Sequence, residues 1–130
     1  MIRKSTIVAT AFSLAACATT ESPDASDSNA TAPAHKFEFT DCELYAKHVA
    51  HQLDEESRSL VKKTEYDDLV QFHHGWGPGI RNASGLWAGN DELNRSCARL
   101  RGRDETIHPD GVSLIVIEEV WKLLREANDT

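Results

Sequence analysis

Five polar residues in the second half of the chain have the types needed for proton transfer and anion binding. His73 or His108 could serve as a general base, and Arg81 could hold an anionic substrate. A cleft that gathered these side chains between two tryptophans would combine charge, proton transfer and an apolar rim. The full set consists of His73, Arg81, Asn82, His108 and Asp110, with Trp76 and Trp87 as the walls.

Each of these residues also has a structural interpretation. His73 lies on the apolar face of a predicted helix, where a buried imidazole is commonly hydrogen-bonded to a neighbour. His74 is about 100° further around that helix, so the two imidazoles cannot easily act as a pair. His108 can cap the helix that begins at Pro109, and Asp110 then meets the positive end of the helix dipole. His73, His108 and Asp110 are therefore catalytic candidates that compete with capping and core roles.

Two further patterns suggest ligand sites, but structural roles explain them better. His48, His51 and Glu55 are spaced so that they point to one side of a helix, as metal ligands must. They lie opposite the apolar stripe, where an amphipathic helix carries its solvated side chains. The glycines of residues 75–79 lack the preceding strand and the following Lys-Ser/Thr of a phosphate-binding loop. We therefore expect no metal and no other cofactor.

Helical spacing of apolar residues predicts the elements that position these side chains. Thr40 with Glu43 fits a capping box, which places a helix over residues 41–55. Thr64 with Asp67 fits a second helix start, over residues 65–75. The predicted inward stripes are Cys42, Tyr45, Ala46, Val49 and Leu53 in the first helix, and Tyr66, Leu69, Val70 and His73 in the second.

The second half of the chain carries its own start and stop signals. Pro78 should end or kink the second helix, and a short helix resumes over residues 80–82. Asn90 can cap a helix that turns Leu93, Cys97 and Leu100 inward and stops at Gly102. From Pro109 a long, mostly apolar helix follows, with a buried strand over residues 112–117 as the alternative. The pattern predicts a compact all-α bundle of about four to five helices.

The first residues have the layout of an export signal. Arg3 and Lys4 precede an apolar run over residues 7–16, which is too short to span a bilayer. The tetrapeptide Leu14-Ala15-Ala16-Cys17 resembles the lipobox of bacterial lipoproteins. That resemblance implies cleavage before Cys17 and acylation of this cysteine with two or three chains, whereas an ordinary secretory signal is the alternative reading.

Composition separates a tether from a domain. The lipobox resemblance and Ala18 in place of an aspartate imply a cell-envelope protein in the outer membrane, facing the periplasm. Residues 18–35 contain no large apolar side chain, so 17–36 form a lipidated end and flexible linker and 37–130 the domain. The formal charge of −7 becomes more negative when Arg3 and Lys4 are removed, which argues against nucleic acid as a partner. A basic partner or a neutral ligand fits better.

The remaining cysteines follow from this location. With Cys17 lipidated, Cys42 and Cys97 are the free thiols of the chain. An oxidising periplasm allows a disulfide between them, and two reduced core cysteines are the alternative. The sequence does not decide, because a bridge needs Cα atoms within about 7 Å of each other.

Four short motifs stand out along the domain: Asp68-Leu69-Val70-Gln71-Phe72-His73-His74-Gly75, Ile80-Arg81-Asn82, Gly85-Leu86-Trp87 and His108-Pro109-Asp110. Together they resemble an uncharacterised family of small bacterial domains, over about residues 40–125. Gly111, Val112 and Pro78 depart from that family's pattern. The resemblance implies no activity, but it implies that Arg81, Asn82, Trp87 and His108 form one cluster, structural or functional.

Three functions remain open at this point. The first is a non-enzymatic envelope lipoprotein whose acidic helical domain binds a protein, in the manner of periplasmic immunity proteins, through a cluster of Trp76, Arg81, Asn82 and Trp87. The second is a small enzyme that uses His73 or His108 with Arg81. The third is a structural envelope component.

Overall fold

The fold consists of six α-helices and two short 3₁₀ helices, and no strand occurs in residues 36–128, which the structure describes. The structure is a computed structural model. The predicted signal segment, Cys17 and linker lie outside the described residues. In chain order the elements are α1 (Cys42–Gln52), α2 (Glu55–Lys63), η1 (Tyr66–Asp68), α3 (Gln71–Gly75), α4 (Gly77–Ala83), η2 (Leu86–Ala88), α5 (Asp91–Arg99) and α6 (Pro109–Glu126). The predicted all-α class is confirmed.

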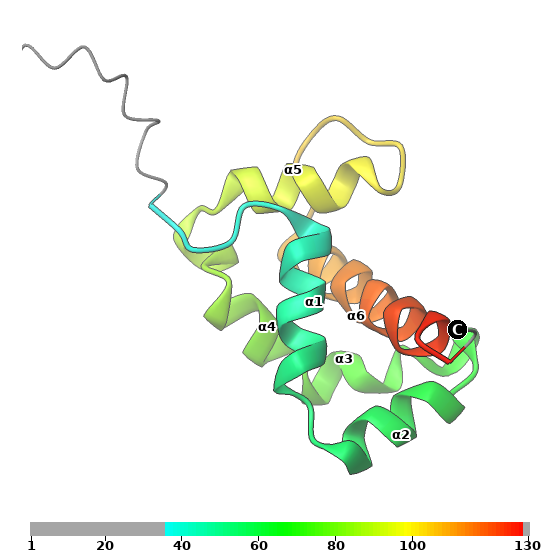
Figure 1. The fold of residues 1–130 in the computed structure, drawn as a ribbon. Helices are drawn as coiled ribbons and strands as arrows, with labels where there is room; N and C mark the ends of the chain where they lie inside the picture. The colour runs from blue at the N-terminus through cyan, green and yellow to red at the C-terminus, as the bar shows by residue number, and fades with distance from the viewer. Residues whose placement is uncertain (1–35, 129–130) are drawn as a thin grey trace, which may run out of the picture. The chain divides into compact units, whose positions relative to one another are not determined.

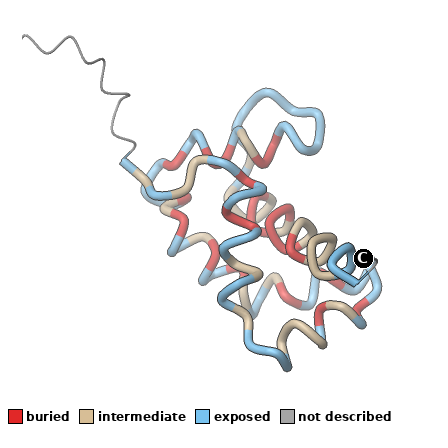
Figure 2. The backbone as a smooth tube through the Cα atoms, in the orientation of Figure 1, coloured by how far each residue is buried: buried red, intermediate tan, exposed pale blue. Residues whose placement is uncertain are grey.

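The last helix, α6, is the centre of the domain. All five other α-helices contact it, and Figure 1 shows it between α5 above and α2 below. Its buried side chains are concentrated in the first half, as the red segments of Figure 2 show. Each β-branched or leucine-sized side chain contributes about 1.5–3 kcal/mol when it is fully buried. Residues 112–117, for which a strand was the alternative, are helical. The buried apolar residues of α6 are Val112, Ile115, Val116, Ile117 and Val120.

A disulfide joins the first helix to the fifth. Cys42 and Cys97 are bonded, their Cα atoms are 4.9 Å apart, and both residues are fully buried. The backbone amide of Cys42 donates to the hydroxyl of Ser96, the neighbour of Cys97, at 2.9 Å. The start of α1 is thereby fixed against α5.

The helix predicted over residues 41–55 is shorter than the sequence pattern indicated. It ends at Gln52, because Asp54 accepts a hydrogen bond from the amide of Ser57 and so begins α2, which was not predicted. Hydrogen bonds from the backbone and side chain of Ser57 lower the pKa of Asp54 below its usual value. The N-cap of α1 is Asp41 rather than Thr40, since Asp41 accepts from the amide of Leu44.

The second predicted helix start was also wrong. Thr64 ends α2, where its hydroxyl donates to the carbonyl of Leu60 at 2.8 Å. Residues 65–75 then divide into η1 and α3, and Val70, which was predicted to face inward, is 57% exposed. Leu100 lies at the end of α5 and is exposed as well. η1 and α3 are each too short to keep a predicted stripe of side chains on one continuous buried face.

Residues that begin or end a helix predicted the structure better than the apolar stripes did. Pro78 lies in the first turn of α4, so the chain breaks between Gly75 and Gly77 as predicted. Asn90 caps α5 by accepting from the amide of Leu93 at 3.2 Å. These caps depend on residues a few positions apart, which the sequence contains in full.

Candidate functional site

An ion pair links α4 to the start of α6. Nη1 of Arg81 lies 3.2 Å from Oδ1 of Asp110 and donates to the hydroxyl of Ser113 at 3.1 Å. The hydroxyl of Ser113 in turn donates to the backbone carbonyl of Asp110 at 2.8 Å. The Arg81 side chain is only 12% exposed, so its charge is largely removed from water and is balanced by Asp110.

His108 caps α6 beside this pair. Its Nδ1 accepts from the backbone amide of Asp110 at 3.2 Å and lies 3.6 Å from Oδ2 of the same residue. Because Nδ1 acts as an acceptor, the neutral ring carries its proton on Nε2. The ring also meets Trp87 edge-on, with centroids 5.9 Å apart. The predicted capping role of His108 is therefore present, and it coexists with exposure of the ring.

Trp87 is exposed in a turn whose backbone is fixed. The indole is 58% exposed. It belongs to the short helix η2, which lies between Gly85 and Gly89. Both glycines have a left-handed backbone, with φ of 76° and 86°, which other residues adopt at a cost. The side-chain amide of Asn90 donates to the carbonyl of Ser84, which ties the turn to α4. We call Trp87, His108 and Asp110 the Trp87 surface.

His73 approaches Arg81 from the other side, across Gly77. A Cβ at Gly77 would lie 3.3 Å from Nδ1 of His73 and 2.8 Å from Nη1 of Arg81, so this glycine allows the close approach. Nδ1 of His73 and Nε of Arg81 are both buried and have no hydrogen-bond partner within the described chain. The structure thus brings Arg81, Asp110, His108 and Trp87 into one connected group, and His73 lies beside Arg81 across Gly77.

Comparison with known proteins identifies the family but no activity. Residues 46–124 match the family model of a domain of unknown function, DUF6794. The chain belongs to the DUF6794 family. This agrees with the resemblance to an uncharacterised family of small domains, and the matched range contains the whole group around Arg81. No curated protein matches the chain, and no solved structure does.

Two predicted members of the site have no contact with this group among the interactions of the DUF6794 domain described above. Trp76 stacks on Phe72, with ring centroids 4.8 Å apart, and lines a separate apolar groove of about 230 Å³ between α1 and α4. Asn82 is exposed, and its side chain makes no hydrogen bond in residues 36–128. Trp76 thus packs in the groove between α1 and α4, whereas Trp87 meets His108, and a single cleft walled by both tryptophans stays a prediction.

The apolar groove contains an aromatic wall from α1. Tyr45 lines it and donates its hydroxyl to the carbonyl of Ile80 at 3.1 Å. Burial raises the pKa of the Tyr45 phenol, and a hydrogen bond with Ser84 partly offsets that rise. His48, one of the metal candidates, lies at the groove and packs on the ring of Phe39, with centroids 4.6 Å apart.

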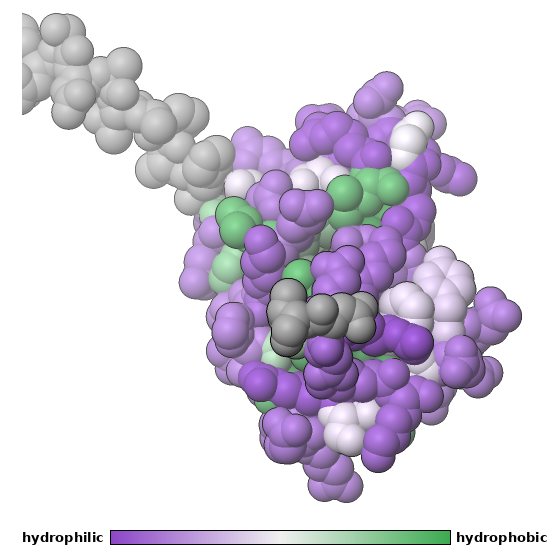
Figure 3. All heavy atoms as spheres, turned by 45° about the vertical axis from the view of Figure 1, so that its right-hand side comes forward, coloured by the Kyte–Doolittle hydropathy of each residue, from purple (hydrophilic) through white to green (hydrophobic). Residues whose placement is uncertain are grey.

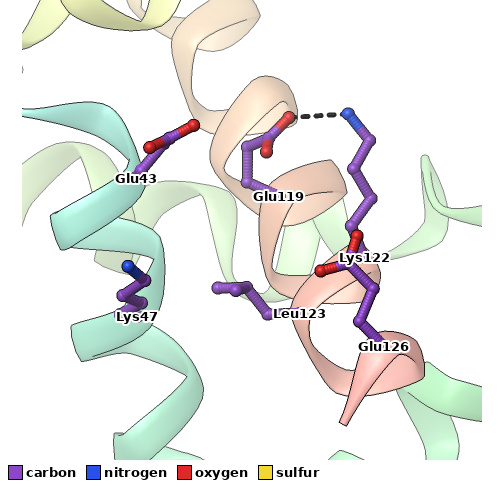
Figure 4. A pocket seen from close by; sticks show the side chains of 6 residues that line it. All are labelled: Glu43, Lys47, Glu119, Lys122, Leu123 and Glu126. Atoms are coloured by element: carbon purple, nitrogen blue, oxygen red, sulfur yellow. Dashed lines mark hydrogen bonds and ion pairs between the residues drawn. The ribbon is translucent and has the colours of Figure 1, made fainter. Parts of the chain in front are cut away.

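A second groove of the DUF6794 domain runs between α1 and α6. Figure 4 shows Glu43 and Lys47 on one side of it and four residues of α6 on the other, around a volume of about 210 Å³. Lys122 pairs with Glu119 at 2.8 Å, and Arg101 approaches the same carboxylate at 3.8 Å. Charges of both signs line this groove, so it selects no single ligand charge. The α6 residues are Glu119, Lys122, Leu123 and Glu126.

The segment between α2 and α3 forms an exposed feature that sequence reasoning missed. Tyr66 is 49% exposed, Val70 is exposed too, and the three acidic residues among residues 65–68 have no ion pair within the described residues. We call residues 65–70 the acidic turn. The signal was the run Glu-Tyr-Asp-Asp, but the helix predicted there turned Tyr66 and Val70 toward the core.

Contacts with α6 hold the acidic turn in place. The ring of Tyr66 packs edge-on against Trp121, with centroids 5.7 Å apart. The indole nitrogen of Trp121 donates to the carbonyl of Thr64 at 2.9 Å, and Arg125 stacks over the same indole at 4.6 Å. The acidic turn is therefore supported by a rigid helix.

Residues 36–128 contain no group of three or more His, Cys, Asp or Glu side chains placed to hold a metal ion. Over the same residues, no helix is both long enough and apolar enough to cross a membrane.

Proposed function

We propose that this chain is an exported protein, held at a membrane by lipid on Cys17, whose DUF6794 domain binds a basic protein partner. Export is supported by two independent features. The lipobox-like segment ends at Cys17, and the buried Cys42–Cys97 bridge is a feature of proteins that fold in oxidising compartments.

The acidic turn is the observation that carries the binding proposal. An exposed tyrosine and an exposed valine lie within five residues of each other, and carboxylates without ion pairs flank them. Tyrosine is among the residues enriched at interface hot spots, because it buries a large area with little loss of side-chain entropy. The contact of Tyr66 with Trp121 lowers that entropy loss further.

Charge favours a basic partner over an acidic or neutral one. The whole chain has a formal charge of −7, and the carboxylates of Glu65, Asp67 and Asp68 meet no cation in the described residues. Such uncompensated charge steers a basic surface toward the acidic turn and speeds association. The face of the domain in Figure 3 is mostly hydrophilic, and its hydrophobic residues form small separate groups. A small apolar contact surrounded by charge fits that surface.

The geometry gives less support to an enzyme that holds an anionic substrate with Arg81. Nη1 of Arg81 already contacts Asp110 and Ser113, and the side chain is mostly buried. An anion would have to displace the Asp110 carboxylate. This carboxylate lies in the first turn of α6, where its negative charge also interacts favourably with the positive end of the helix dipole.

Capture from envelope extract tests the binding proposal. The full-length protein, extracted from membranes in detergent, is immobilised, and bound proteins are quantified by mass spectrometry. Leu44→Ala is the matched control, because Leu44 is 59% exposed but belongs to α1 and not to the acidic turn. We expect a basic protein in stoichiometric amount with the wild type and the control, and a loss of about 30-fold with Tyr66→Ala, as for a hot spot of about 2 kcal/mol. Equal recovery on all three proteins, or recovery of no protein at all, would contradict the proposal.

Mass measurement tests the anchor separately. The wild-type protein from the membrane fraction should begin at Cys17 and carry the added mass of a diacylglyceryl group and an acyl chain. The Cys17→Ser variant should lack this mass and leave the membrane fraction. An unmodified wild-type protein in the soluble fraction would refute lipid anchoring and leave the binding proposal intact.

A further inference from the structure

The Trp87 surface has the features of a ligand site, and they are unrelated to the acidic turn. Trp87 is exposed in a turn that two left-handed glycines fix. His108 and Asp110 are also accessible and lie at the start of a long helix that the core holds in place. The backbone that carries the three side chains is therefore held in place before any ligand arrives, which lowers the entropy lost on binding.

The charges of this surface cancel. Asp110 is the counter-ion of Arg81, and Nδ1 of His108 accepts a hydrogen bond from the backbone amide of Asp110. A charged ligand would gain little here. Its attraction to one member of the Arg81–Asp110 pair would be offset by repulsion from the other member, a few ångströms away. The surface therefore favours a neutral ligand.

His108, which meets the indole, and Asp110, which lies beside His108, offer both a donor and an acceptor. Nε2 of His108 carries the ring proton and can donate, since Nδ1 is used as the cap acceptor. The carboxylate of Asp110 has acceptor sites beyond the contact with Arg81, because two oxygens provide about four lone pairs. A neutral ligand that fits has an apolar face for the indole and hydroxyl groups that both donate and accept around its edge.

A sugar ring has this combination. Its C–H face is apolar and flat enough to lie on an indole, and its edge is lined by hydroxyls. We propose that Trp87, His108 and Asp110 form a saccharide-binding site, in which the sugar ring stacks on Trp87 and its hydroxyls bond to the other two side chains. Arg81 is a positioning residue, since it orients the Asp110 carboxylate and is itself held by Ser113.

NMR titration of the full-length protein in detergent tests this site. The probes are three neutral tetrasaccharides, chitotetraose, cellotetraose and maltotetraose, and the signals are the indole N–H resonances of the three tryptophans. We expect at least one probe to shift one indole resonance saturably, with a Kd on the order of 1 mM, and this resonance to be absent from Trp87→Phe. Trp87→Ala should weaken binding by about tenfold or more, and Asp110→Asn should weaken it while the fold is retained.

The control variant is Leu100→Ala, which removes another exposed apolar side chain without touching this surface. It should bind the sugar as the wild type does. Three outcomes would overturn the site. The first is no shift with any probe up to about 10 mM, and the second is an indole shift that persists in Trp87→Ala. The third is a Trp87→Ala variant that still binds the sugar but no longer captures the protein partner. The first two leave the proposed protein-binding function untouched, because Tyr66 carries that function.

Discussion

The Cys42–Cys97 disulfide closes a loop that contains most of the domain, because the two residues are 55 positions apart. A cross-link of this span lowers the entropy of the unfolded chain by about 14 cal/mol/K in the chain-entropy model, which corresponds to about 4 kcal/mol at 25 °C. Domains of this size unfold with only about 5–15 kcal/mol in total. Breaking the bridge should therefore remove a large part of the stability, and lower the melting temperature by about 15–30 °C.

Urea unfolding measures this effect with two complementary perturbations. Reduction of the wild type breaks only the sulfur–sulfur bond, whereas Cys42→Ala with Cys97→Ala removes both sulfur atoms from fully buried positions. Both should lower the free energy of unfolding by about 4 kcal/mol, and reductant should have no further effect on the double variant. Alkylation in denaturant, followed by peptide mapping, should label both cysteines of the exported protein only after reduction. A stability difference below about 1 kcal/mol, or labelling before reduction, would refute this account of how α1 is held to α5.

Three further substitutions have expected outcomes that follow from individual contacts. Tyr45→Phe should cost about 1 kcal/mol at neutral pH. Because the raised pKa of the phenol makes the wild type lose stability as pH rises through that pKa, the variant should resist alkaline unfolding better. Asn94→Ala removes two hydrogen bonds of 2.8 Å to the backbone before α6 and should lower the unfolding free energy by about 2–3 kcal/mol in a urea titration. Gly85→Ala should lower the melting temperature more than Gly89→Ala. Both substitutions force a strained backbone, but only a Cβ at Gly85 meets the ring of Phe37, at 2.5 Å. Equal melting temperatures would mean that Phe37 is not packed there.

Short-range signals explain which parts of the fold the sequence predicted. The cap at Asn90 and the proline that begins α6 each depend on a few neighbouring residues, and both elements begin where expected. The break between α1 and α2 was missed because apolar spacing continues through Leu53, although Asp54 and Ser57 form a second cap. Periodicity describes a face that a helix could present, whereas a cap determines where the helix begins.

The candidate site was predicted in part, and the missing part is a matter of chain direction. Arg81, His108 and Trp87 come together because α4, η2 and the start of α6 are neighbours in space. Trp76 lies before the bend into α4 and stacks on Phe72 instead. The angle of that bend depends on tertiary packing, which residue spacing does not contain. The exposure of Tyr66 was missed for a similar reason, since it depends on the ring of Trp121, 55 residues later.

The two proposed surfaces differ in electrostatics, so ionic strength separates them. Carboxylates of the acidic turn are uncompensated within the described residues, and attraction of a basic partner to them is screened over about 8 Å at physiological salt. At the Trp87 surface Asp110 is already balanced by Arg81, and stacking on an indole involves no net charge. Raising the salt concentration from about 0.05 M to about 0.5 M should therefore weaken protein capture through Tyr66 and leave the saccharide affinity at Trp87 nearly unchanged. If both respond alike, one charged surface recognises both ligands, and the division between the two sites is wrong.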